Sequence, residues 1–565
     1  MIRTLFFLLF LSEVYGGRNN PLEITLKQGT LRGHTLTSRK GRDIFAFQSI
    51  PYAKPPLKEL RFQPPQPPDP WKGVLDATVH SPICIQFWSL LNPINLTGTE
   101  DCLYLDVFTP RLPDNSEEFK SLDVIFCVPG GAYEFGNSFL FGSEYLLDKD
   151  VILVTINYRL GPLGFLSTND AVCPGNNGLK DQVAALKWVR ENIAEFGGNP
   201  DHVTIIGHSS GAAIAHNHML SPASKGLFHR AISLSGTALN VWALAPPEVS
   251  KKNAKKLATA LHCPTESSRE LISCLKEKEA YDITKTLEIF QTWGTFPTFA
   301  FLPVVEKDVG EGDEAFIPVE PLKYLLTTKD VDLVPWIVGM TSGEGAFYIA
   351  NIFNKRVLIE ELNDRFDEIM PMFFMYADTS TPSAVKNITR QIREFYFGNK
   401  TISYDTIQAA IDMYGDAGFK HGFYLAAKLH AMRGAQVFYY EFDYRGTNSY
   451  STNFGICRDI GVSHTDDVLY LFPQDKYLFP GSIRSETDDR MIDILTTLYS
   501  NFIQTGNPTP QPCDLGVWKP VSSPDTLEYA RIDLKGVHMG KNLRKKEFAF
   551  WDSLPLGLQM EANTE

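Results

Sequence analysis

A nucleophilic serine is predicted in the segment Val203–Ala215, which reads VTIIGHSSGAAIA. Ser209 is the central residue of a Gly-x-Ser-x-Gly pentapeptide, preceded by an apolar strand-like run and followed by alanine-rich, helix-favouring sequence. A sharp strand–turn–helix connection lifts such a serine hydroxyl above the end of a sheet. Gly207 and Gly211 leave room where the chain crosses itself closely. The alternative interpretation is a tight turn with a structural role only.

A second group of small residues, Pro129–Tyr133 (PGGAY), directly follows the apolar run VIFCV. Consecutive small residues after a strand can turn successive backbone N–H groups toward one point and form an anion-binding nest. The residue after the nucleophile, Ser210, would add its own backbone N–H to such an oxyanion hole. The alternative is a simple turn that ends the strand.

A serine nucleophile needs a base and an acid that orients the base. His464 lies in the glycine-flanked loop Gly461–Asp467, before an apolar run. Glu344 lies between two glycines after a strand-like run, where α/β sites assemble. His208 adjoins the serine, but a neighbour on a strained turn points away from the hydroxyl. Three other downstream histidines are assigned to surface or packing positions, or lie near the chain end: His421, His430 and His538.

Short apolar runs that alternate with helix-like stretches must position these residues. In Leu179–Phe196, Val183, Leu186, Val189 and Ile193 recur at helical spacing. The apolar runs predicted as strands are Val124–Val128, Val151–Ile156, Val203–Ile206, Ala231–Leu234, Trp336–Val338 and Val437–Glu441. This alternation indicates an α/β fold with a large, mostly parallel sheet covered on both faces. The more irregular segment Pro246–Pro335 is predicted to form insertions above the sheet ends.

The composition is that of a folded globular protein. Of 565 residues, 44% are hydrophobic and 21% are charged, which is too apolar for a disordered chain and too polar for a multispanning membrane protein. The net charge of −13 argues against nucleic acid as a partner, because phosphate binding requires a surplus of Lys and Arg. We found no repeats and no linker that would separate domains.

The first 16 residues are interpreted as a secretion signal. Arg3 supplies a basic start, Leu5–Leu11 (LFFLLFL) an apolar core, and Val14–Gly16 a small residue at a plausible cleavage point. The apolar run is too short to span a bilayer. We therefore expect one mature domain over residues 17–565, located outside the cell and without a membrane anchor.

Export would permit disulfides and glycans. Two local cysteine pairs would close short loops, Cys84 with Cys102 and Cys263 with Cys274, whereas Cys127 lies in an apolar strand and is assigned to the core. Partners for the other cysteines are left open: Cys173, Cys457 and Cys513. Candidate glycosylation sites are the three sequons at Asn95, Asn387 and Asn399.

The chain resembles a type-B carboxylesterase, of the group that includes cholinesterases and secreted insect esterases. The resemblance covers nearly the whole expected mature chain. Gly339–Gly345, which contains Glu344, resembles the family's acid loop, and Gly461–Asp467, which contains His464, resembles its histidine loop. Further matching stretches, in the family's order, are Ile50–Pro56 (IPYAKPP), Glu100–Val107 (EDCLYLDV), Asn157–Phe165 (NYRLGPLGF), Gly178–Gln182 (GLKDQ) and Phe196–Pro200 (FGGNP).

The resemblance implies the α/β-hydrolase fold and assigns roles to individual residues. It implies a catalytic triad of Ser209, Glu344 and His464, and an oxyanion hole of backbone N–H groups. The further residues implied are Gly131, Ala132 and Ser210 in the hole, Trp242 and Phe299 in the acyl pocket, disulfides Cys84–Cys102 and Cys263–Cys274, and ion pairs Arg61–Glu100 and Arg159–Asp181.

The chain departs from the family pattern near the nucleophile. Pro129 replaces the usual His or Tyr but removes only its own N–H. His208 and Ser210 replace the usual Glu and Ala, which removes a negative charge that would attract a cationic substrate. The loop that begins at Cys84 is short, with Trp88 near its start and no aromatic residue where cholinesterases bind choline. These differences argue against a specialist for choline esters.

The sequence therefore predicts a secreted serine carboxylesterase. It would hydrolyse apolar carboxylic esters through an acyl-enzyme intermediate, in detoxification or in the turnover of hormone or pheromone esters. Its partner is a small-molecule ester, and the chemistry requires no metal or other cofactor. The alternative from another class is a non-catalytic, cholinesterase-like binding or adhesion protein, against which the intact triad argues.

Overall fold

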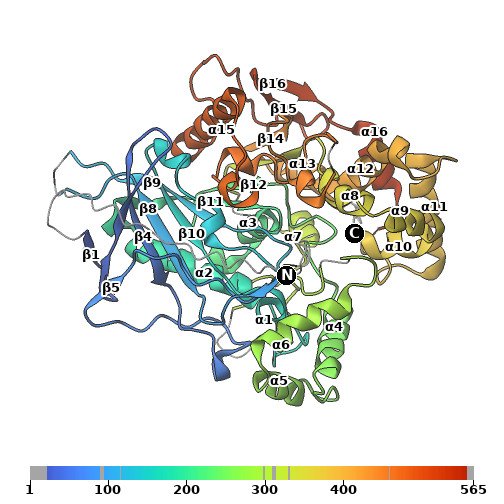
Figure 1. Cartoon of the computed structure of the whole chain (residues 1–565), viewed down its shortest axis with the longest axis horizontal. Helices are drawn as coiled ribbons and strands as arrows, with labels where there is room; N and C mark the ends of the chain where they lie inside the picture. Colours follow the sequence, from blue (N-terminus) through green and yellow to red (C-terminus); the bar gives the residue numbers. More distant parts are fainter. Residues whose placement is uncertain are drawn as a thin grey trace, which may run out of the picture.

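The computed structural model describes residues 22–556 except 89–94, 115, 117, 297–298, 308, 310–313, 329–330, 332 and 457. The described residues form an eleven-stranded mixed sheet that runs through the molecule (Figure 1). Its strands, in spatial order, are β16 (Gly536–Lys541), β15 (Glu528–Asp533), β14 (Val437–Phe442), β13 (Trp336–Thr341), β12 (Arg230–Leu234), β11 (Gly198–His208), β9 (Leu122–Val128), β10 (Val151–Ile156), β8 (Tyr104–Thr109), β4 (Asp43–Pro51) and β3 (His34–Thr37).

The central strands, from β10 to β15, are parallel to their neighbours, and antiparallel strands flank them at both ends. All six predicted strands are present, and most extend a few residues beyond the predicted run. Two small sheets accompany the large one. They consist of β1 (Glu23–Thr25), β2 (Thr30–Arg32) and β5 (Val74–Asp76), and of β6 (Gln86–Trp88) and β7 (Asn95–Thr97).

The apolar runs are continuous because both faces of the sheet are buried. In β9, Ile125 and Cys127 lie in one apolar cluster, whereas Val124, Phe126 and Val128 lie in the other. Burial on alternate sides follows from the period of two residues in a strand. The Cys127 side chain is therefore a core residue, as predicted.

Helices cover both faces of the sheet (Figure 1). The helix α15 (Glu486–Thr505) packs in one cluster, and α2 (Asn177–Asn192), α3 (Ser210–Leu220) and α13 (His421–Met432) pack in the other. A capping box starts α15, because Ser485 and Asp488 each bind the other's backbone N–H. The apolar spacing in the 179–196 segment correctly predicted α2.

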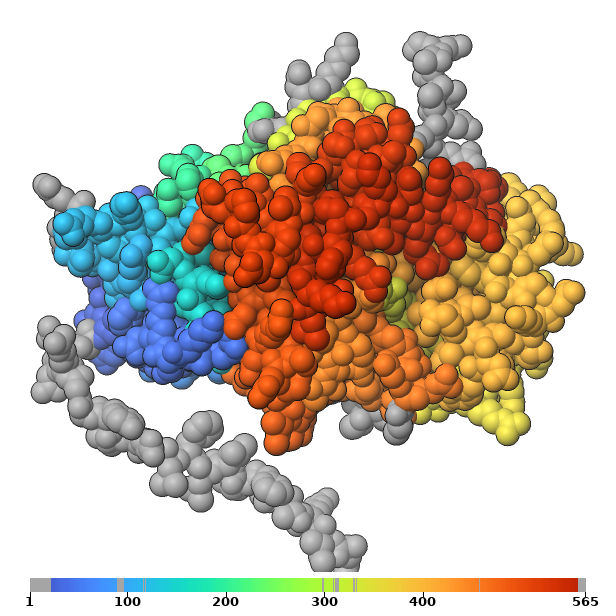
Figure 2. Space-filling model, turned by 90° about the horizontal axis from the view of Figure 1, so that it is seen from above, coloured from blue at the N-terminus to red at the C-terminus, as the bar shows by residue number. Residues whose placement is uncertain are grey.

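The structure contains further helices. The segment Pro246–Pro335 is more helical than predicted, because it contains the helices α4 (Pro247–Ala260), α5 (Ser268–Lys276), α6 (Ala280–Lys285) and α7 (Pro321–Thr327). In Figure 2, the yellow residues at about positions 350–400 lie at the opposite end of the molecule from the blue residues of the N-terminal part. The remaining helices are α1 (Gly161–Phe165), α8 (Ala346–Phe353), α9 (Arg356–Asp364), α10 (Phe366–Phe373), α11 (Pro382–Phe397), α12 (Ile407–Gly415), α14 (Asp475–Leu478) and α16 (Lys545–Ser553).

The carboxyl ends of the parallel strands bring the predicted chemical groups to one edge of the sheet. Ser209 follows β11, and Glu344 follows β13 by three residues. Gly131 follows β9, and His464 lies in the long connection after β14. Ligand sites of open α/β sheets form at this edge.

Candidate active site

The turn that carries Ser209 has the strained geometry expected of a nucleophile elbow. Ser209 has φ +56° and ψ −123° between the end of β11 and the start of α3. A Cβ atom at Gly207 would lie 2.0 Å from the Gly211 carbonyl oxygen, and one at Gly211 would lie 2.3 Å from that of Val128. Only glycine allows these close approaches, which explains both glycines of the pentapeptide.

The side chains of Ser209, His464 and Glu344 form one hydrogen-bonded chain. His464 Nε2 lies 2.9 Å from Ser209 Oγ, and His464 Nδ1 lies 2.6 Å from Glu344 Oε2. Because an ionised carboxylate only accepts, His464 carries its proton on Nδ1, and Nε2 is free to accept the serine proton. The structure therefore brings together all three residues that the sequence pointed to.

Surrounding donors hold Glu344 in the ionised form. Its second oxygen accepts hydrogen bonds from the Ser235 hydroxyl at 2.5 Å and the Thr341 backbone N–H at 2.8 Å. Complete burial by itself would raise the pKa of Glu344, but the charge and hydrogen bond of His464, with the two other hydrogen bonds, outweigh burial and lower it. The carboxylate can then stabilise a protonated His464 ring.

The loop after β9 presents backbone N–H groups next to Ser209. Within the described part of the chain, no group accepts a hydrogen bond from the backbone N–H of Gly131, Ala132 or Ser210. Gly131 and Ala132 have positive φ values of +127° and +56°, and Ser210 is the first residue of α3. Three unpaired donors beside a serine hydroxyl, one at a helix N-terminus, can stabilise a developing oxyanion. The Pro129 carbonyl accepts a hydrogen bond from the Tyr158 hydroxyl, and its missing N–H leaves these donors intact.

A cavity of about 90 Å³ opens onto Ser209. It contains no Asp, Glu, Lys or Arg among its described lining residues, so these residues place no carboxylate, ammonium or guanidinium charge in its walls. Its aromatic and aliphatic walls are Trp88, Phe135, Leu140, Phe141, Phe347, Tyr348, Tyr450 and Leu478, and its remaining lining residues are Gly130, Gly131, Ala132, Gly136, His208, Ser209, His464, Thr465 and Gln474.

Trp242 and Phe299 are not among the described residues that line this cavity. Their rings stack with centroids 5.5 Å apart, and the Trp242 indole N–H donates to the Gly418 carbonyl. Phe419 connects them to the site, because its ring lies 5.6 Å from Trp242 and 4.5 Å from His464. No pattern in the sequence indicated a role for Phe419, which lies in the short π-helix Asp416–Lys420.

His208 does not contact the Ser209 hydroxyl as a base would. Its Nε2 atom lies 2.9 Å from the Thr465 hydroxyl, and its ring lies 5.2 Å from the His464 ring. Burial, reinforced by His464, lowers the pKa of His208 well below its usual value. His208 is therefore a neutral part of the cavity wall.

The other downstream histidines occupy positions away from Ser209. His421 and His430 are both buried on α13, where His430 packs against His216 and Trp336. His538 lies on β16 beside Asp533. Packing positions for the two α13 histidines agree with the sequence interpretation.

Two disulfides and two ion pairs have the predicted partners. The disulfides are Cys84–Cys102 and Cys263–Cys274, and the ion pairs are Arg61–Glu100 and Arg159–Asp181. Cys173 is a buried free thiol, Cys513 is an exposed one, and Cys457 lies outside the described residues.

The predicted processing sites lie partly beyond the described residues. The expected signal, residues 1–16, and the side chain of Asn95 are outside them. Asn387 and Asn399 are exposed, on α11 and just after it. The described residues contain no helix long and apolar enough to cross a bilayer. They also contain no cluster of three His, Cys, Asp or Glu side chains suited to a metal ion.

The fold and the serine–histidine–glutamate arrangement together define an α/β-hydrolase. A sequence model of the carboxylesterase family matches residues 20–551. Esterase FE4 of Myzus persicae is 39% identical over 529 residues, covering 91% of this chain and 90% of that protein. Juvenile hormone esterase of Tribolium castaneum is 36% identical over 509 residues, covering 87% and 84%.

A solved structure gives the same result. The crystal structure of juvenile hormone esterase from Manduca sexta, with OTFP covalently attached, matches with a TM-score of 0.84 at 30% identity, covering 95% of this chain and 99% of that one. The chain belongs to the carboxylesterase family, and it is a carboxylic ester hydrolase.

Proposed function

We propose that this enzyme is a secreted serine esterase that cleaves uncharged, apolar carboxylic esters with Ser209, His464 and Glu344 as its catalytic triad. The observation that carries the proposal is the continuous hydrogen-bonded chain from Ser209 Oγ through both nitrogens of His464 to Glu344. This arrangement is the one needed to make a serine hydroxyl nucleophilic.

In the proposed mechanism, Ser209 Oγ attacks the ester carbonyl carbon while His464 Nε2 takes the hydroxyl proton. The backbone N–H groups of Gly131, Ala132 and Ser210 stabilise the tetrahedral oxyanion. His464 returns the proton to the departing alcohol, which leaves an acyl group on Ser209. Water then attacks the acyl carbon while His464 takes one of its protons, the bond between the acyl carbon and Ser209 Oγ breaks, and His464 returns the proton to Ser209 Oγ as the carboxylic acid is released.

The cavity walls support uncharged esters as the substrate class. Apolar lining with a few polar groups favours ligands of the same character. His208 adds no positive charge, because burial lowers its pKa. Phe419 packs against the His464 ring and Trp242 packs against Phe419, so the surroundings of the site on this side are aromatic as well.

Export is part of the proposal. The basic and apolar start of the chain favours a signal peptide over residues 1–16. Two disulfides support the same assignment, because disulfides persist in oxidising compartments outside the cytosol. The exposed sequons Asn387 and Asn399 are the proposed glycan sites that the described residues include.

Replacement of Ser209 tests the proposed nucleophile. We expect Ser209→Ala to lower turnover of a p-nitrophenyl short-chain ester at least about 10³-fold. Ser224→Ala is the matched control, because Ser224 Oγ also lies near a histidine, 2.6 Å from His218 Nδ1, but outside the cavity. The control should retain turnover. Substantial turnover by Ser209→Ala would eliminate this serine as the nucleophile.

A further inference from the structure

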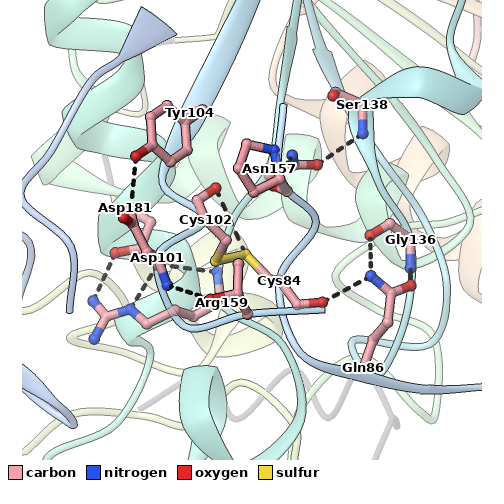
Figure 3. The surroundings of a disulfide bond; sticks show 12 residues. Cys84, Gln86, Asp101, Cys102, Tyr104, Gly136, Ser138, Asn157, Arg159 and Asp181 are labelled. Atoms are coloured by element: carbon pink, nitrogen blue, oxygen red, sulfur yellow. Dashed lines mark hydrogen bonds and ion pairs between the residues drawn. A yellow bond between two sulfur atoms is a disulfide. The ribbon is translucent and has the colours of Figure 1, made fainter. Parts of the chain in front are cut away.

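The buried side chain of Gln86 links strand β6 to the loop that forms the proposed oxyanion hole (Figure 3). Its Oε1 atom accepts a hydrogen bond from the Gly136 backbone N–H at 3.0 Å. Its Nε2 group donates to the Gly136 carbonyl at 3.3 Å and to the Cys84 carbonyl at 2.9 Å. One amide side chain therefore binds both backbone polar groups of a single loop residue.

The oxyanion loop, residues 130–136, closes on itself at Gly136. A Cβ atom at Gly136 would lie 2.1 Å from the Gly130 carbonyl oxygen, so the last and first residues of the loop are in close contact. Inside the loop, the Gly131 carbonyl accepts hydrogen bonds from the N–H groups of Glu134 and Phe135. These bonds direct the Gly131 carbonyl into the loop and thereby orient the Ala132 N–H, which belongs to the same peptide plane. The Gly130 carbonyl, which Gly136 contacts, shares a peptide plane with the Gly131 N–H. The position of Gly136 therefore affects the orientation of both N–H groups.

Strand β6 contacts this loop a second time and is itself covalently anchored. The Trp88 ring stacks on Phe135 with centroids 5.0 Å apart. Cys84, two residues before Gln86, forms the disulfide with Cys102, which is fully buried and lies two residues before β8 of the large sheet. A continuous chain of contacts therefore runs from the large sheet through the disulfide and Gln86 to the oxyanion loop.

We propose that Gln86 is a positioning residue for the oxyanion hole, held in place by the Cys84–Cys102 disulfide. The inference rests on the proposed function, because it assigns a role within that mechanism. Hydrogen-bond donors stabilise a transition state only when they are already aimed at the developing charge. Gln86 touches no substrate and acts through Gly136.

The test compares Gln86→Met with a control in the same region, Asn157→Leu. Asn157 is also buried, and it bridges the Pro82 carbonyl and the Ser138 N–H, so it joins the segments that flank β6 and the oxyanion loop (Figure 3). Its bonds do not reach residues 130–136. Both substitutions remove the hydrogen bonds of a buried amide side chain and put an apolar side chain of similar size in its place.

Three measurements separate positioning from general stability. They are kcat and KM for a p-nitrophenyl short-chain ester, the inhibition constant of an alkyl trifluoromethyl ketone, and the thermal midpoint. Such a ketone accepts the serine oxygen at its carbonyl carbon and places an oxyanion in the hole, so its affinity reports on the donors directly. Enzyme concentrations are normalised to the protein that remains folded at the assay temperature.

We expect Gln86→Met to lower kcat about 10- to 100-fold, a fraction of the loss that follows removal of a whole oxyanion donor. The inhibition constant of the ketone should rise by a similar factor, with KM changed by less than about threefold. Asn157→Leu should lower the thermal midpoint yet leave kcat and the inhibition constant within about threefold of wild type. Gln86→Leu also removes both hydrogen-bonding groups, should have the same effect, and replaces Gln86→Met if that variant does not fold.

Unchanged kcat and ketone affinity in folded Gln86→Met would overturn the inference. The inference would also fail if kcat of Gln86→Met fell while its affinity for the ketone stayed at the wild-type value. It would fail as well if Asn157→Leu lowered kcat and ketone affinity by the same factors as Gln86→Met. These failures are distinct from failure of the proposed function, in which Ser209→Ala would retain turnover.

Discussion

The Thr465 hydroxyl lies within hydrogen-bond distance, 2.9 Å, of His208 Nε2. This contact directly joins the residue that follows the proposed base to the residue that precedes the proposed nucleophile. Thr465 has φ +80°, an unfavourable backbone conformation for a β-branched residue. The contact with His208 helps to hold this strained turn and places a neutral ring in the cavity wall.

The first prediction concerns the charge preference set by His208. The wild-type enzyme should prefer 3,3-dimethylbutyl acetate to the isosteric cation acetylcholine. A carboxylate at position 208 would attract the cation, so His208→Glu should shift the kcat/KM ratio toward acetylcholine about tenfold, or about 1.4 kcal/mol. His208→Gln is the uncharged control and should leave the ratio unchanged. Equal ratios in the Glu and Gln variants would refute a role for charge at this position.

The second prediction concerns Glu344 as the residue that orients His464. Glu344→Gln keeps the size of the side chain but removes the charge, and its amide can stabilise the wrong tautomer of His464. We expect kcat to fall about 10³- to 10⁴-fold. Glu344→Asp retains the charge on a shorter side chain and should lose less. Stopped-flow assays of both variants with a p-nitrophenyl ester check this order, and a Gln variant as active as wild type would contradict it.

The third prediction concerns Glu134, a buried carboxyl on the oxyanion loop whose oxygen accepts a long hydrogen bond, 3.4 Å, from the Ala300 N–H. Burial raises the pKa of Glu134 to about 8. In the unfolded chain it ionises at its ordinary lower pKa, so the folded state holds one more proton between these values. This difference makes the free energy of unfolding decrease as pH rises from about 5 to 8.

Glu134→Gln removes that dependence and keeps an acceptor for Ala300. The variant should gain stability relative to wild type by up to roughly 1.4 kcal/mol per pH unit across this range. Urea unfolding at several pH values measures the gain, with Glu195→Gln, at an exposed position, as control. A stability difference that is the same at every pH would show that Glu134 does not titrate in this way.

The fourth prediction concerns the Cys263–Cys274 disulfide, which links α5 to the residues just after α4. Neither cysteine lines the cavity. Replacing both with Ser should lower the free energy of unfolding by about 2–4 kcal/mol. The kcat of the folded enzyme should stay unchanged, and Cys513→Ser, at an exposed free thiol, should change neither quantity. A large loss of kcat in the double variant would mean that this disulfide also positions the active site.

The sequence predicted the elements that its local patterns determine. Leu179–Phe196 shows helical periodicity, and the run at Val151–Ile156 is a strand with the predicted bounds. The elbow at Ser209 was predictable because glycine is required wherever the backbone crosses itself. Glu344 and His464 were placed by their glycine-flanked loops and by family resemblance, because no local pattern reports a contact across more than a hundred residues.

The walls of the cavity were predicted less well. Trp242 and Phe299 were expected to line the acyl pocket, and they are not among the described lining residues of the cavity at Ser209; Phe419 contacts both Trp242 and His464. Phe347 and Tyr348 line the cavity because α8 begins directly after the acid loop. These positions depend on how helices pack above the sheet, and that packing leaves no period in the sequence. The link from Gln86 to Gly136 was missed for the same reason.

The most direct test of the account is covalent labelling of the native enzyme with diethyl p-nitrophenyl phosphate. Intact mass measurement and peptide mapping should find one diethylphosphoryl group per chain, attached to Ser209, with activity lost in proportion to labelling. Ser209→Ala should take up none at the same reagent concentration. Inactivation with the phosphoryl group on another residue, or with Ser209 unmodified, would contradict the assignment of Ser209 as the nucleophile.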